Sequence, residues 1–247
     1  MARLVRDAPV PTLQQIRRVI AVMPSVSDIE QRDRALIAFT SLTGARDGAI
    51  ASLKLKHLDL TQGMVMQDTR EVHTKFNKTF PTWFFPVGED IRWIVEEWVR
   101  HLRETLLWSP DDPLFPATLV AQGEDRRFRP AGLARRHWAN ATPIRTIFRE
   151  AFTLAGLIYF NPHSFRKTLA QLGEQKCQTP EQFKAWSQNL GHERVMTTFA
   201  SYGAVSVSRQ AEIIRSLALE AEPDERVKEV ARQLMRLGAG SRGPITS

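Results

Sequence analysis

The sequence predicts an α+β fold that is mainly helical, with a small antiparallel three-stranded sheet near residues 63–87. Apolar residues recur at helical spacing over most of the chain. Only the stretch near 63–87 has short runs rich in Val, Thr, Phe and Trp. The 247 residues, 43% of them hydrophobic, suffice to bury a sizeable core without disulfides or metals.

Two helices are predicted first. One begins at Pro11-Thr12 and stops at Pro24. The next begins at Ser27, which forms a capping box with Glu30 three residues later, and it is predicted to end near Gly44. A short helix is expected over 47–53.

The strands of the sheet are predicted at 63–67, 71–74 and 79–87. Pro81 and Pro86 indicate that the last of them is an edge strand or irregular, because proline cannot donate to a ladder.

The second half is expected to be helical, apart from a turn-rich break at 109–116 and a basic polar loop at 123–130. The predicted helices are 90–107, 131–155, 164–176, 180–190, 194–201, 206–218 and an amphipathic segment at 223–237.

The charge balance is basic, with 34 Lys+Arg against 27 Asp+Glu and a net charge of +7. This favours an anionic partner, of which nucleic acid is the commonest. The densest basic stretch contains Arg126, Arg127, Arg129, Arg135, Arg136 and His137, and a second contains Lys54, Lys56 and His57. Either stretch could contact phosphates or simply be a solvated face.

Cys177 is the single cysteine, so neither an intrachain disulfide nor a Cys-rich zinc site is possible. No apolar run approaches the roughly 20 residues of a membrane span, and the N-terminus lacks the apolar region of a signal peptide. The expected setting is reducing and cytoplasmic, without a membrane.

Four local patterns contain the candidate site residues. They are Thr43-Gly44-Ala45-Arg46; Lys75 in a polar turn; Pro162-His163-Ser164-Phe165-Arg166; and Leu190-Gly191-His192 followed by Thr197-Thr198 and Tyr202. In this order and spacing they resemble the catalytic domain of the tyrosine recombinase (phage integrase) family, over roughly residues 12–219. Each piece alone is common, whereas the full set is specific.

The chemistry can be argued from the residues. A tyrosine has a pKa of about 10, so forming the phenolate at pH 7 costs about 4 kcal/mol. A nearby base or cluster of cations must offset that cost. Two arginines suit a phosphodiester, because planar guanidinium groups match its non-bridging oxygens and stabilise the charge of a phosphorane.

The resemblance implies a role for each residue. Tyr202 attacks the scissile phosphate and forms a 3′-phosphotyrosyl link. Arg46 and Arg166 clamp the non-bridging oxygens, and Lys75 is the general acid for the leaving 5′ oxygen. His163 assists proton transfer from the tyrosine, and His192 hydrogen-bonds the phosphate. This exchange of esters requires no metal or other cofactor.

Some nearby residues compete for these roles. Lys78 lies in the same turn as Lys75, which is favoured because the family's lysine usually comes first. Tyr159 is the only other tyrosine and is expected to pack in the core. The remaining histidines are expected to be bystanders without an acidic cluster beside them: His57, His73, His101 and His137.

The chain departs from the family pattern at two places. The family usually has an acidic residue three positions after the first arginine, where this chain has Ala49, and Asp47 is expected to face another side of the helix. The family also usually has a helical DNA-gripping domain before this one. We therefore expect residues 1–219 to be a catalytic domain with the N-terminal core-binding domain absent.

The apolar stripe of 223–237 must be buried somewhere. It could pack on its own domain or, as the family suggests, the segment 220–237 could be exchanged between subunits of a tetramer on double-stranded DNA. Residues 238–247, rich in Gly and Ser, are expected to be a disordered tail.

The leading hypothesis is a site-specific recombinase located in the cytoplasm with the nucleoid. The alternatives are a type IB topoisomerase or hairpin resolvase with similar chemistry, a non-catalytic DNA-binding relative, and a metal-dependent nuclease. The nuclease is disfavoured because no carboxylate cluster accompanies the histidines.

Overall fold

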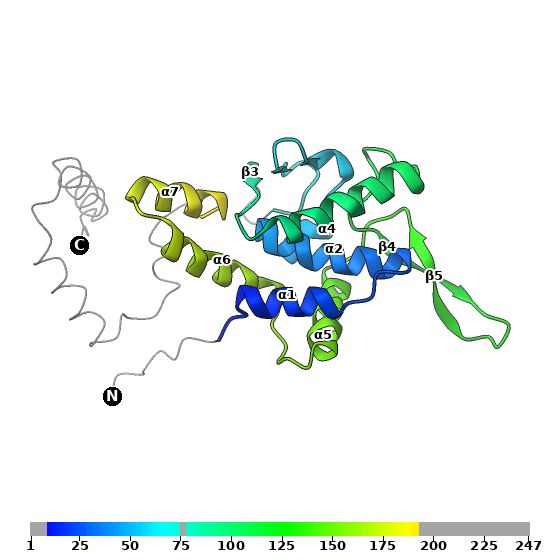
Figure 1. Ribbon diagram of the computed structural model, residues 1–247. Coiled ribbons are helices and arrows are strands. Elements are labelled where there is room, and N and C mark those ends of the chain that lie inside the picture. The colour runs from blue at the N-terminus through cyan, green and yellow to red at the C-terminus, as the bar shows by residue number, and fades with distance from the viewer. Residues whose placement is uncertain (1–8, 75–77, 193–247) are drawn as a thin grey trace, which may run out of the picture. The chain divides into compact units, whose positions relative to one another are not determined.

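The structure is a computed structural model that describes residues 9–74 and 78–192 (Figure 1). The helices are α1 Leu13–Val22, α2 Asp28–Thr43, α3 Asp47–Ile50, α4 Glu89–Arg100, α5 Thr142–Leu154, α6 Pro162–Lys176 and α7 Pro180–Asn189, with single turns at Leu55–His57 and His101–Thr105. The strands are β1 Leu58–Asp59, β2 Met64–Gln67, β3 Phe80–Trp83, β4 Ala117–Gln122 and β5 Phe128–Ala134. The predicted fold class, mainly helical with a small antiparallel sheet, is confirmed.

Helix α2 is the centre of the core and contacts α1, α4 and α6 (Figure 1). Leu36 and Phe39 are fully buried in it, and its apolar residues surround the helix, as expected for a helix covered on every side. The predicted capping box starts it, since the Ser27 hydroxyl accepts from the Glu30 N–H and the Glu30 carboxylate accepts from the Ser27 N–H. Local sequence thus sets where this helix begins.

The three-stranded sheet has the order β1-β2-β3, but one of its strands was wrongly predicted. Residues 71–74 form turns instead of a strand, because the Val72 N–H donates to the Asp68 carbonyl and the Glu71 side chain binds Lys56. The strand that the sequence analysis missed is β1, Leu58–Asp59, which is too short to show an alternating pattern.

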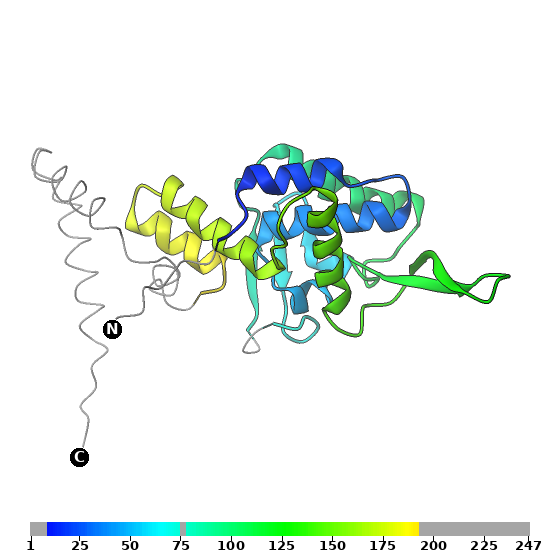
Figure 2. The same cartoon turned by 90° about the horizontal axis from the view of Figure 1, so that it is seen from below.

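A second sheet was missed. Residues 123–130 were predicted as a loop and 131–155 as a helix, whereas β4 and β5 form an antiparallel hairpin and α5 begins only at Thr142. Pro130 disfavours a helix here, and so does Gly132, which has a φ of +131°. The hairpin extends away from the helices in both views (Figure 2).

Helices α6 and α7 fall within two residues of their predicted starts and ends. Helix α7 is fastened to the sheet through Asn189, whose side chain accepts from the Trp83 N–H and donates to the Trp83 carbonyl. No helix in the described ranges is long and apolar enough to cross a membrane. The helices predicted at 194–201, 206–218 and 223–237 lie outside the described residues.

Candidate active site

The end of α2 brings Arg46 to the site. Gly44 ends the helix with a φ of +58°, a left-handed conformation that favours glycine. A Cβ there would also lie 2.9 Å from Leu169, so a side chain has no room. The chain then turns, and Arg46 occupies the N-cap position of α3 without a capping bond from its side chain.

Arg166 ties three elements together from within α6. Its guanidinium donates to the Gly44 carbonyl at 2.6 Å and to the Leu190 carbonyl at the end of α7. The same nitrogen that reaches Leu190 lies 3.2 Å from Nε2 of His192. The side chain is buried, and its Nε has no hydrogen-bond partner among the described residues. One donor of this buried cation therefore remains for another acceptor.

His192 is placed by a tight turn after α7. The Gly191 φ is +68°, and a Cβ at this position would lie 2.8 Å from the Phe80 ring. The His192 N–H donates to the Ser187 carbonyl at 3.1 Å, which closes the turn. The Leu190-Gly191-His192 pattern thus has a local reason as well as a chemical one.

His163 lies in the first turn of α6, after Asn161, whose side chain caps the helix by accepting from the Ser164 N–H. His163 and Arg46 line one cavity of about 510 Å³. Pro162 at the first helical position favours this start, because its fixed φ suits a helix. The His-x-x-Arg spacing puts His163 and Arg166 on neighbouring turns of one helix.

The positive charges at this site repel one another. Burial and the nearby Arg46 lower the pKa of Arg166 to about 9, so it stays charged at neutral pH. Burial also lowers the pKa of Arg46. The pKa of His163 is lowered by burial and then by Arg166 and Arg46, which favours the neutral imidazole that can accept a proton. A bound anion would relieve this repulsion.

Arg46, His163, Arg166 and His192 therefore come together at the ends of α2, α6 and α7. Residues 10–209 match the model of the phage integrase family. The chain belongs to that family. The order of its patterns along the chain is the one that the resemblance led us to expect.

Relatives in the family are recombinases. The chain is 26% identical over 184 residues to tyrosine recombinase XerC of Lactobacillus delbrueckii subsp. bulgaricus and to that of Lactobacillus leichmannii. These matches cover 74% of this chain and 54% of the relatives, so the chain spans about half their length.

Solved structures of recombinases share the fold. XerA recombinase matches with a TM-score of 0.59 and 19% identity over 87% of this chain and 65% of that one. XerH bound to a palindromic difH substrate matches with a TM-score of 0.54 and 18% identity, over 79% and 50%. A lambda integrase (75–356) dimer bound to a COC′ core site matches at 0.53 and 14%, over 83% and 65%.

Two predicted site residues, Lys75 and Tyr202, lie outside the described residues. Lys78, the competitor of Lys75, lines a second cavity together with His192. Within the described ranges, no group of three or more His, Cys, Asp or Glu side chains could hold a metal ion.

Two expectations about neighbouring residues were wrong. Tyr159 is 39% exposed, with the Arg149 guanidinium 5.3 Å from its ring centre, because only Phe160 of this segment packs into the core. Asp47 does not face away from the site but lines the cavity with Arg46. Buried Ala49 leaves no carboxylate at its own position.

Two of the bystander histidines do have acidic neighbours. Nε2 of His57 lies 3.0 Å from Glu71, and Nε2 of His101 lies 2.8 Å from Asp28. These partners are distant in sequence, so no local pattern could reveal them.

One residue of the cavity was missed from the sequence. Arg145 of α5 lines it, and its Nε donates to the Asp47 carboxylate at 2.7 Å. The two are 98 positions apart, and no spacing rule links them.

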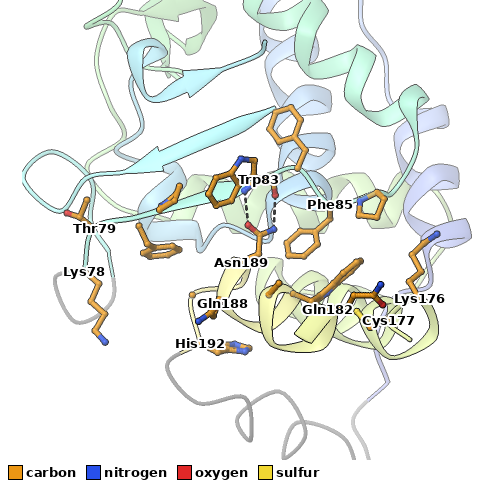
Figure 3. A pocket seen from close by; sticks show the side chains of 17 residues that line it. Lys78, Thr79, Trp83, Phe85, Lys176, Cys177, Gln182, Gln188, Asn189 and His192 are labelled. Atoms are coloured by element: carbon orange, nitrogen blue, oxygen red, sulfur yellow. Dashed lines mark hydrogen bonds between the residues drawn. The ribbon is translucent and has the colours of Figure 1, made fainter. Parts of the chain in front are cut away.

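The second cavity is an open apolar groove of about 920 Å³ between β3 and α7 (Figure 3). Trp83, Phe85 and Trp186 line it, and Lys78 and His192 lie toward one end. The Asn189 bonds to Trp83 hold its two walls together.

Proposed function

We propose that this chain is the catalytic part of a site-specific DNA recombinase that cleaves and rejoins strands through a 3′-phosphotyrosyl link to Tyr202. The observation that carries the proposal is the meeting of Arg46, Arg166, His163 and His192 at three helix ends. Arg46 and Arg166 form no salt bridge with a carboxylate of the described residues, so the site suits a phosphodiester.

Each residue has a separate role in the proposed reaction. Arg46 and Arg166 bind the non-bridging oxygens and stabilise the charge of the phosphorane. Neutral His163 accepts the Tyr202 proton as the phenolic oxygen attacks phosphorus. Lys75 protonates the 5′ oxygen that leaves, and His192 donates to a phosphate oxygen. The reverse attack by a 5′ hydroxyl restores the tyrosine.

The partner that we propose is double-stranded DNA, in the cytoplasm with the nucleoid. Relatives were solved on DNA: XerH on a difH substrate and lambda integrase on a core site. The basic balance of this chain suits the same class of partner. The topoisomerase and resolvase alternatives are not favoured by these matches.

The experiment is covalent capture on a nicked suicide duplex in the presence of chelator. The chain should form a DNA adduct, and Tyr202→Phe should abolish it while leaving binding nearly intact. Tyr159→Phe is the matched control, because Tyr159 lines the cavity with Arg46 and His163 yet should leave the adduct unchanged. An adduct with Tyr202→Phe, or strict dependence on a metal, would refute the assignment.

We also propose that the chain assembles as a tetramer on DNA, with 223–237 of one copy docking in the apolar groove of another. The segment has an apolar stripe and the groove has an apolar, aromatic lining, so each would bury apolar surface against the other. Deleting 224–247 should impair recombination without lowering the melting temperature. Trp83→Ser, at an exposed position in the groove, should act alike. A large drop in melting temperature on deletion would show that the segment belongs to its own core.

A further inference from the structure

The cavity that contains Arg46 and His163 has features that the proposed chemistry does not use. It measures about 510 Å³, far more than the roughly 30 Å³ that one water occupies. Its wall includes a second arginine, Arg145, and the first residues of α6, whose N-terminus is the positive end of a long helix. Asp47 is the one carboxylate among the described residues that line it.

Asp47 controls how Arg145 lies. Its Oδ2 accepts from Nε of Arg145 at 2.7 Å, and its Oδ1 accepts from the Gly48 N–H at 2.9 Å. The carboxylate is thus fixed at the start of α3 and holds the guanidinium by its inner nitrogen. With Nε engaged by Asp47, the two terminal nitrogens of Arg145 remain available to donate to two phosphate oxygens.

Arg145 is accessible to a ligand, whereas Asp47 is better shielded. The Arg145 side chain is 56% exposed and that of Asp47 is 25% exposed. An exposed arginine held by one bond from a less exposed carboxylate is preorganised, so it loses less conformational freedom on binding. The pair on its own does little for stability at such exposure.

We propose that Arg145 is a second phosphate-binding residue and that Asp47 is its positioning residue. Arg145 binds a backbone phosphate other than the one that is cleaved, in the same strand and beside Arg46. Asp47 also supplies a local counter-charge for His163, whose pKa it raises against the effect of the arginines. This inference rests on the proposed function for the identity of the anion.

The chain offers a matched control one turn along the same helix. Arg149 is also exposed on α5 and lies over the ring of Tyr159, but it is not among the residues that line the cavity. Arg145→Gln and Arg149→Gln remove the same charge from neighbouring turns. Any difference between them therefore reports position and not net charge.

The test measures equilibrium binding of a short synthetic duplex by fluorescence anisotropy over a range of salt, in a Tyr202→Phe background that cannot cleave. Arg145→Gln should weaken binding about tenfold and reduce the salt slope by about 0.9, the loss of one phosphate contact. Arg149→Gln should change the affinity by less than about twofold. Equal effects of the two variants would overturn the proposal.

A second arm isolates the positioning role. Asp47→Asn keeps an oxygen that accepts from Arg145, whereas Asp47→Ala does not. If Asp47 were only a negative charge near DNA, both variants would tighten binding equally. The proposal requires that Asp47→Ala bind more weakly than Asp47→Asn, and that this difference vanish in the Arg145→Gln chain.

Covalent capture by the chain with Tyr202 intact separates the two proposals. If no adduct forms but Arg145→Gln still loses one phosphate contact, the recombinase proposal fails and the phosphate site stands. If the adduct forms and Arg145→Gln behaves like Arg149→Gln, the phosphate site is wrong and the recombinase proposal stands.

Discussion

Arg46 precedes α3 in the chain and the cluster of Lys54, Lys56 and His57 follows it, and the basic groups at these two places differ in their electrostatics. At the candidate active site, burial and Arg46 lower the pKa of Arg166 to about 9. In the cluster formed by Lys54, Lys56 and His57, hydrogen bonds to Asp111 and Glu71 raise the pKa of Lys56 to about 12.

The density of basic residues therefore does not identify an anion site. The Lys54–Lys56 cluster has its counter-charges built in, so a phosphate would have to displace Glu71 and Asp111. Arg166 of the active site is held by backbone carbonyls, which satisfy hydrogen bonds without cancelling charge. Its repulsion with Arg46 is available to be relieved by substrate.

The largest effect should come from Arg166. Arg166→Lys replaces the two separately directed nitrogens that donate to Gly44 and Leu190 with one, and an orphaned buried carbonyl costs roughly 1–3 kcal/mol. Covalent capture should be lost, and the free energy of unfolding should fall by roughly 2 kcal/mol in urea denaturation. Arg46→Lys should reduce capture without this loss. A fully stable Arg166→Lys would show that the bonds from Arg166 to Gly44 and Leu190 do not hold the ends of α2 and α7 in place.

The next largest effect should come from Glu71→Gln, which removes one of the two carboxylates that neutralise Lys54 and Lys56. Hydrogen bonds from Lys56, opposed by burial, lower the pKa of Glu71 from 4.5 to about 2. Its contribution to stability is therefore present above pH 4.5 and is lost as the pH falls toward about 2. The melting temperature of Glu71→Gln should lie below that of the parent at neutral pH, and the gap should close over that window.

Glu174 provides a control of opposite sign. Burial raises its pKa, so its ionisation destabilises the fold once the pH rises above its ordinary value. Glu174→Gln should raise the melting temperature at neutral pH only slightly, because this residue is exposed. A gap for Glu71→Gln that stays constant as the pH falls would mean that its carboxylate does not stabilise the cluster.

Local rules predicted the parts of the site that depend on neighbouring residues. Ser27 and Glu30 located the start of α2, and Gly44 located its end. The helix predicted from residue 164 contains Arg166, and α6 begins two residues earlier, so that it includes His163 as well. In each case the physical cause acts within one or two helical turns.

Tertiary pairings explain what could not be predicted. The Asp47–Arg145 bond and the Lys56–Asp111 bond each join residues that are more than fifty positions apart. The β4–β5 hairpin was missed because its basic residues suggested a loop, while Gly132 and Pro130 are as compatible with a loop as with an edge strand. Sequence showed where the cations are but not which of them are neutralised.

A smaller effect should appear in the titration of His163. Its pKa is lowered by burial, then Arg166, Arg46 and Lys167, so removing a cation should raise it. Proton-detected NMR of the imidazole should show a higher pKa in Arg46→Gln and a smaller rise in Lys167→Gln. Lys56→Gln, which belongs to the other cluster, should leave the titration unchanged. An equal rise in all three variants would point to the net charge of the protein rather than to local repulsion.

The smallest effect should come from neutralising the paired lysines. Lys54→Gln/Lys56→Gln should change the salt slope of DNA binding by far less than the roughly 0.9 expected for each lost phosphate contact, because both ammonium groups already bind carboxylates.

The control is Arg126→Gln/Arg127→Gln, which removes the same charge from the exposed hairpin. There Arg129 pairs with Asp125, but no ion pair of Arg126 or Arg127 is found in the described part of the chain. If the hairpin meets the DNA backbone, its double variant should lower the slope by up to about 1.8, two contacts at that rate. The reverse order, with the lysines reducing the slope and the hairpin arginines not, would show that DNA displaces Glu71 and Asp111. Neutralisation in the unbound protein would then not predict which basic cluster binds.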